Sequence, residues 1–187
     1  MRRYRQTHPG VELTLEQNYT PALIERVANG RLDVAFVRPV ENLDGRVKSS
    51  VLFEETFVFV LPDRHAPGGE GVPDAAWLSR QPLVMFERDN GPGLYDTIIQ
   101  TCRRLGFEPH VGQHSSRVGS IVPLVSAGFG IAIVPQSVSS IHAEGVVFRA
   151  IDRSIATAPV AIIWRMEDHS GQVASFLRLA AVARRKR

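Results

Sequence analysis

Short runs of consecutive apolar residues, alternating with segments of helical spacing, constrain the fold of this chain more than any other feature of its sequence. The runs occur at Val34–Val37, Phe57–Leu61, Leu83–Phe86, Ile131–Val134 and Val160–Trp164. Runs of this length, bounded by turn residues, are typical of strands that are covered on both faces. Because helical patterns lie between them, the sequence predicts an α/β fold with mainly parallel sheets.

The first of these runs follows a segment with alternating polarity and a predicted helix. Apolar side chains occupy every second position of residues 11–16, which predicts a strand with one buried face. A helix is expected over residues 21–29. Thr20 is its expected N-cap, Pro21 its first residue and Gly30 its stop. Strand, helix and strand together predict a right-handed βαβ unit.

Helical spacing predicts further helices over residues 94–105 and 116–127 and near the C-terminus. Pro123 lies inside the second of these segments and is expected to kink the helix or to remove one of its hydrogen bonds. The Gly- and Pro-rich loop at residues 63–73 is the best candidate for a boundary between two lobes.

Composition and charge exclude several classes of protein. The 187 residues are 44% hydrophobic, enough for a globular core, yet no apolar run approaches the roughly 20 residues that span a bilayer. The basic start is followed by Thr7-His8-Pro9-Gly10 rather than by the apolar core of a signal peptide, so we expect no membrane partner and a cytoplasmic location. Much of the net charge of +3 sits at the two ends, including residues 184–187, which is more typical of solvated helix ends than of a nucleic-acid surface.

The residue types that carry chemistry in enzymes and metalloproteins are scattered along the chain. The 6 histidines form no HxxxH or HxH pair, so we expect no metal site and no cofactor. Cys102 lies at helical spacing from apolar residues, which predicts a buried and unreactive thiol. Ser115-Ser116 lacks the GxSxG context of a nucleophile, and serines before a helix usually cap it. No catalytic residues are therefore expected.

Two glycine-containing segments are only superficially similar to phosphate-binding loops. Gly91-Pro92-Gly93 opens a helix, whose N-terminus attracts anions, but Leu94 follows where a P-loop requires lysine. Two interpretations stay open for it: a turn that only starts the helix, and a docking point for an anionic or polar group. Gly128-Phe129-Gly130 follows a helix and precedes a strand, which is the reverse of the order in a dinucleotide-binding motif.

Three stretches, taken in order and spacing, resemble the regulatory domain of LysR-type transcription regulators. Residues 5–13 and 30–38 are similar to the family pattern RxxxPxVxL followed by GxLDxAxxR. Phe57–His65 is similar to a family strand that ends in LPxxHP, and Leu124–Pro135 to LVAxGxGxxxxP. Each stretch alone is modestly specific, but together, in order and spacing over nearly the whole chain, they are quite specific.

The resemblance implies an α/β fold of two Rossmann-like lobes with the type 2 architecture of periplasmic binding proteins. Lobe one would comprise residues 1–60 and 160–187, and lobe two residues 61–159. In the family, a winged helix-turn-helix, a linker helix and the first strand of lobe one precede the point where this sequence begins. Lobe one is therefore expected to lack its first strand, and DNA to be contacted only through a helix-turn-helix domain absent from these residues.

The resemblance also implies a function: a small-molecule effector, here an organic acid, binds in the cleft between the lobes. The family's binding positions correspond to Thr20, Arg38, Pro92, Gly93, Leu94, Ser115 and Ala161. Hydroxyls of Thr20 and Ser115 would bind the ligand, helix ends would favour its carboxylate, and Leu94 would supply an apolar contact. Residues 90–96 are most similar to the branch that senses aromatic-degradation intermediates.

Alternatives remain for both the protein and one of these residues. A solute-binding receptor of a transport system shares the two-lobed architecture, and an enzyme on the same fold is a further alternative. Arg38 is expected to pair with an anionic ligand or to brace the hinge, but an ordinary exposed arginine fits the same sequence. The family resemblance further implies a homodimer.

Overall fold

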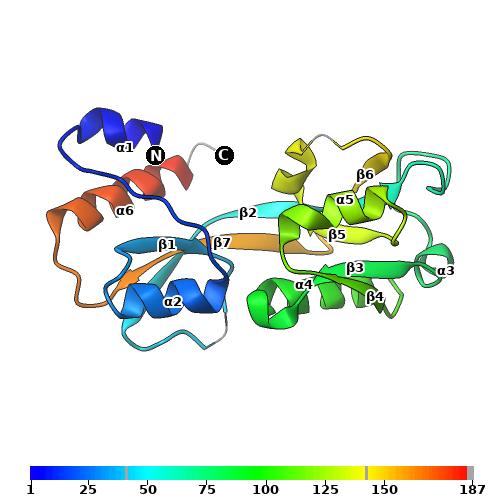
Figure 1. The fold of residues 1–187 in the computed structure, drawn as a ribbon, viewed down its shortest axis with the longest axis horizontal. Helices are drawn as coiled ribbons and strands as arrows, with labels where there is room; N and C mark the ends of the chain where they lie inside the picture. Colours follow the sequence, from blue (N-terminus) through cyan, green and yellow to red (C-terminus); the bar gives the residue numbers. More distant parts are fainter. Residues whose placement is uncertain (41, 142, 185–187) are drawn as a thin grey trace. The chain divides into compact units, whose positions relative to one another are not determined.

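The structure, a computed structural model, describes residues 1–40, 42–141 and 143–184 (Figure 1). The chain divides into two compact units. Unit 1 consists of Met1–Phe53 and Pro159–Arg187, and unit 2 of Glu54–Ala158. Two strands, β2 (Val47–Pro62) and β7 (Thr157–Arg165), carry the chain from one unit into the other. Of the six histidines, His142 lies outside the described residues, as do residues 185–187 of the basic tail.

In unit 1, helices cover both faces of a small sheet (Figure 1). β1 (Val34–Val37) pairs antiparallel with β7, from Val34 opposite Trp164 to Val37 opposite Ala161. Alternate side chains of these strands point to opposite faces. One face packs on α2 (Thr20–Ala28), and the other on α1 (Arg2–Thr7) and α6 (Gly171–Arg184). The run at 34–37 is a strand, as predicted, but Phe36 on the α6 side is 46% exposed, so the predicted cover on both faces is only partial.

The strand predicted over residues 11–16 is not present, so the predicted βαβ unit is wrong. Apolar side chains of this segment pack with Tyr4 and the α6 face of unit 1, but Leu15 is 74% exposed. On the other side, the Glu16 carboxylate lies 2.9 Å from Nε of Arg26 on α2. Within the described residues, β1 ends the strand order and pairs only with β7. Alternating polarity places side chains on two sides, but without a neighbouring strand the backbone of residues 11–16 makes no ladder.

An arginine–aspartate pair ties the end of α2 to the start of α6. Arg165 donates to the carbonyl oxygens of Val27 and Leu32, both at 3.4 Å, and its Nη2 lies 2.9 Å from Oδ2 of Asp168. The backbone N–H of Ser170 donates to Asp168 Oδ1 at 2.9 Å. Burial opposes ionisation of Asp168, but the hydrogen bonds from Ser170 and the charge of Arg165 outweigh it, so its pKa is lowered.

Unit 2 contains one parallel and one antiparallel strand arrangement around a single core. β3 (Pro82–Phe86) and β4 (His110–Ser115) are parallel, whereas β5 (Ala132–Pro135) and β6 (Val146–Ala150) both pair antiparallel with β2. The helices are α3 (Ala75–Leu78), α4 (Pro92–Arg104) and α5 (Ile121–Ser126), and the 3-10 turns are η1 (Arg88–Asn90), η2 (Val118–Ser120) and η3 (Gln136–Ser140). The expectation of mainly parallel sheets is wrong, because the pairing direction depends on contacts between segments far apart in sequence.

The helix predicted over residues 116–127 is shorter than expected. α5 begins at Ile121, so Pro123 lies in its first turn, where no backbone N–H is needed for the helical ladder. The predicted kink therefore does not arise. After α5, Gly130 has φ 137°, and a Cβ built there would lie 2.0 Å from the carbonyl oxygen of Pro82. Only glycine fits this approach between the turn and β3.

Candidate functional site

The candidate site in unit 2 lies at the carboxyl edge of the parallel strands β3 and β4. Phe86 and Ser115, the last residues of these strands, are register partners. α4 begins at Pro92, a few residues after Phe86. In α/β sheets, ligands bind beyond the carboxyl ends of parallel strands, where helix N-termini gather. Four of the seven predicted binding residues therefore meet at one edge: Pro92, Gly93, Leu94 and Ser115.

The start of α4 offers backbone amides rather than side chains. Gly91 is its N-cap and supplies no side-chain hydrogen bond, and Pro92 follows at the first helical positions. The amides of Gly93 and Leu94 have no carbonyl one turn earlier to accept their protons. The Leu94 side chain is buried in the core of unit 2. What α4 presents to an anion is thus the positive end of a 13-residue helix.

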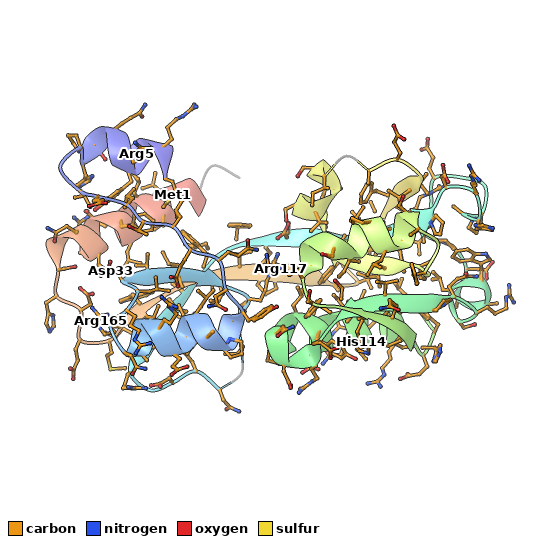
Figure 2. The ribbon with its side chains drawn as sticks, in the orientation of Figure 1. Met1, Arg5, Asp33, His114, Arg117 and Arg165 are labelled. Atoms are coloured by element: carbon orange, nitrogen blue, oxygen red, sulfur yellow. The ribbon has the colours of Figure 1, made fainter. Side chains whose placement is uncertain are left out.

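Ser115 is buried, with 6% of its surface exposed, and its hydroxyl closes the turn that follows β4. Oγ donates to the carbonyl oxygen of Arg117 at 2.9 Å and accepts from the Arg117 N–H at 3.3 Å. The expectation that Ser115-Ser116 caps a helix is wrong, because Arg117 is the N-cap of η2 and Ser120 that of α5. A carboxylate that accepts from this hydroxyl has to replace its hydrogen bond to the carbonyl oxygen of Arg117, which Figure 2 labels.

Three predicted binding residues lie in unit 1. Ala161 is fully buried opposite Val37, so its side chain belongs to the core. Arg38 follows Val37 and is half-buried, and its Nη1 donates to the carbonyl oxygen of Pro159 at 3.3 Å. This contact braces β7 near the point where that strand enters unit 1. Arg38 is accordingly not an ordinary exposed arginine.

Thr20, the third residue of this set, is the first residue of α2 rather than its N-cap. Tyr19 occupies the N-cap position, and no side chain caps the helix. Thr20 is half-buried at a helix N-terminus. Gly30 ends the helix region with φ 72°, which confirms the predicted stop.

Charged side chains flank the start of α4, and the sequence reasoning missed them. Arg88 makes a bidentate pair with Asp96, with Nε 2.9 Å from Oδ1 and Nη2 2.7 Å from Oδ2. Beside them, Nδ1 of His114, labelled in Figure 2, lies 3.6 Å from Oε1 of Glu87. The only sequence signal was opposite charge on either side of the Gly91-Pro92-Gly93 turn, which does not by itself indicate a contact.

The structure shows the environment of the remaining candidate groups. Cys102 is fully buried on α4, which confirms the predicted burial, and this burial raises the pKa of its thiol to about 12, which disfavours the reactive thiolate. Among the described residues, no group of three or more His, Cys, Asp or Glu side chains is arranged to hold a metal ion. Within the same part of the chain, no helix is long and apolar enough to cross a membrane.

A comparison with protein families identifies the family to which this fold belongs. The profile described as LysR substrate binding domain matches residues 1–184. The chain belongs to this family. Among curated relatives, the LysR-domain chain is 31% identical over 176 residues to the HTH-type transcriptional regulator BudR of Raoultella terrigena, covering 94% of this chain and 61% of BudR. It is 30% identical over 165 residues to TtuA of Agrobacterium vitis, covering 86% of this chain and 54% of TtuA. It thus spans less than two thirds of the length of these regulators.

Solved structures of the family share the fold. Full-length CbnR in complex with its target DNA superposes with a TM-score of 0.85 at 21% identity, covering 98% of this chain and 64% of CbnR. The BenM effector-binding domain with its effector benzoate gives 0.82 at 23% identity, covering 99% of this chain and 84% of that domain. The predicted α/β fold of the type 2 periplasmic-binding-protein class is confirmed. This LysR-family chain is therefore an effector-binding domain of the kind found in transcription regulators.

Proposed function

We propose that this domain senses a small organic acid on behalf of a LysR-type bacterial transcription regulator. The observation that carries the proposal is the uncapped N-terminus of α4 beside Ser115, at the carboxyl edge of β3 and β4. Backbone amides at this helix N-terminus attract a carboxylate. They do so without a cationic side chain, which would need a counter-charge when no ligand is bound.

The proposal gives each predicted binding residue a role within its own unit. Thr20 contributes a hydroxyl and the start of α2, and Arg38 a guanidinium that pairs with negative charge. Gly93 and Leu94 contribute amides, Pro92 shapes the turn, and Ser115 contributes its hydroxyl. Ala161 contributes backbone from β7, because its side chain is buried.

The relatives support an aromatic or other carboxylic acid as the ligand class. BenM binds benzoate, an aromatic carboxylate, in its effector-binding domain. A probable cat1 operon transcriptional activator of Acinetobacter lwoffii is 28% identical over 171 residues. We therefore propose aromatic acids and dicarboxylic acids as the first compounds to test.

The proposal also covers the partners of the whole regulator. Its named relatives are transcriptional regulators, so we propose binding without turnover. DNA contact is assigned to a helix-turn-helix domain of the kind for which these relatives are named, and not to residues 1–187. A homodimer in the cytoplasm completes the proposal.

A thermal-shift screen of aromatic and dicarboxylic acids tests the central claim. A ligand that binds only the folded domain stabilises it by about 2.7 kcal/mol at 100 times its dissociation constant, enough to raise the melting midpoint by several degrees. Titration calorimetry then gives the affinity of each hit. A panel without a single saturable binder would refute the proposed ligand class.

A further inference from the structure

The turn before α4 is crossed by a bidentate ion pair whose two members belong to different elements. Arg88 lies on η1 and Asp96 in the second turn of α4. Between the two elements stands Gly91, where a Cβ would come 3.3 Å from the Phe86 ring. A residue without a side chain leaves the backbone freer to rotate than any other residue does. The Arg88–Asp96 pair therefore spans a glycine at the junction between η1 and α4.

We infer that the Arg88–Asp96 pair is a positioning clamp, which holds η1 and α4 in the arrangement that presents the Gly93 and Leu94 amides to a carboxylate. The inference rests on the proposed function, because it concerns the same site. Neither clamp residue needs to touch the ligand. Its effect is to increase the fraction of molecules in which the turn is competent to bind.

The exposure and the bidentate geometry of the Arg88–Asp96 pair favour a role in local positioning over a role in overall folding stability. The side chains of Arg88 and Asp96 are 57% and 44% exposed, and exposed ion pairs change folding stability little. A bidentate fork nevertheless fixes both distance and orientation, since two parallel N–H···O bonds are made at once. An exposed pair of this kind shifts a local equilibrium by no more than about fivefold.

The other end of α4 supplies a matched control. Arg103 forms a fork with Glu108 of the same bidentate geometry, at 3.0 Å from Nε to Oε2 and 2.8 Å from Nη2 to Oε1. These side chains are 59% and 68% exposed. Both forks thus join an arginine and an acid at the surface of one helix, but only the first lies beside the turn at Gly91.

The experiment compares Arg88→Gln, Asp96→Asn and their double variant with Arg103→Gln. Backbone amide exchange of Asn90, Gly91 and Tyr95, whose N–H groups close the turn, is measured by NMR without ligand. Benzoate affinity and the melting midpoint are measured on the same proteins. We expect each clamp variant to speed exchange and weaken benzoate binding by up to about fivefold, with little change in midpoint. The double variant should match the single ones, and Arg103→Gln should behave as wild type.

Two outcomes would overturn the clamp. Unchanged exchange in both single variants would show that the fork does not hold the turn. Affinity changes of opposite sign would show that the charges act on the ligand directly, because removing Arg88 takes away a cation and removing Asp96 an anion. Failure of the proposed function looks different: wild type then binds no acid of the panel, while the exchange measurement still decides whether the fork holds the turn.

Discussion

Replacement of Ser115 by alanine tests the part of the site that the structure defines most closely. The variant removes a buried hydroxyl that donates to Arg117 at 2.9 Å and accepts from it at 3.3 Å. A typical intramolecular hydrogen bond contributes about 1 kcal/mol to stability, and the second bond is long. We therefore expect Ser115→Ala to lower the free energy of unfolding by roughly 1–2 kcal/mol.

The expected loss of ligand affinity follows from the same contacts. Because the hydroxyl is already satisfied, a bond to the ligand exchanges one partner for another and its net contribution is small. Ser115→Ala should weaken binding of an acid identified in the screen by roughly fivefold. Thr20→Val is the contrasting variant, since no cap bond is made by a side chain at the start of α2. It should lose roughly 5- to 150-fold in affinity with little change in stability.

Urea denaturation and calorimetric titration of both variants provide the measurements. A Ser115→Ala protein that unfolds at the wild-type midpoint would refute the argument that its hydroxyl holds the turn after β4. If both variants bind the acid as tightly as wild type, Thr20 and Ser115 are not ligand contacts and the ligand lies elsewhere.

Three further predictions concern stability. Gly130→Ala should prevent folding or cost several kcal/mol, because its Cβ would lie 2.0 Å from the Pro82 oxygen at φ 137°, and circular dichroism at increasing temperature measures this. Cys102→Ala should destabilise by roughly 1–3 kcal/mol through the cavity left in the core, yet leave acid affinity unchanged in titration. The lowered pKa of Asp168 means that its ionised form stabilises the fold above its unfolded pKa near 4, and that this contribution is lost as pH falls through the still lower folded value. Asp168→Asn should therefore reduce the fall of the urea midpoint as the pH is lowered. A variant whose midpoint falls as steeply as that of wild type would contradict this.

The sequence by itself determined much of the local structure and the family. The apolar runs that became β1, β3 and β5 were predicted nearly to the residue, because short apolar runs bounded by turn residues are typical of strands. Gly30 as a helix stop and the buried Cys102 follow equally from local pattern. The family motifs resembled those of LysR-type regulators, and the profile match over residues 1–184 shows the membership.

Only the tertiary structure decided how these segments pair and which polar groups meet. Residues 11–16 have the alternation of a strand, but a ladder needs a neighbour whose position no local pattern specifies. The antiparallel partners of β2 come from segments far along the chain, so their direction was not readable from periodicity. The turn held by Ser115 and the ion pair between Arg88 and Asp96 likewise arise because folding brings polar side chains to specific distances. Such contacts depend on backbone geometry to within a fraction of an ångström, which residue order alone does not encode in any readable pattern.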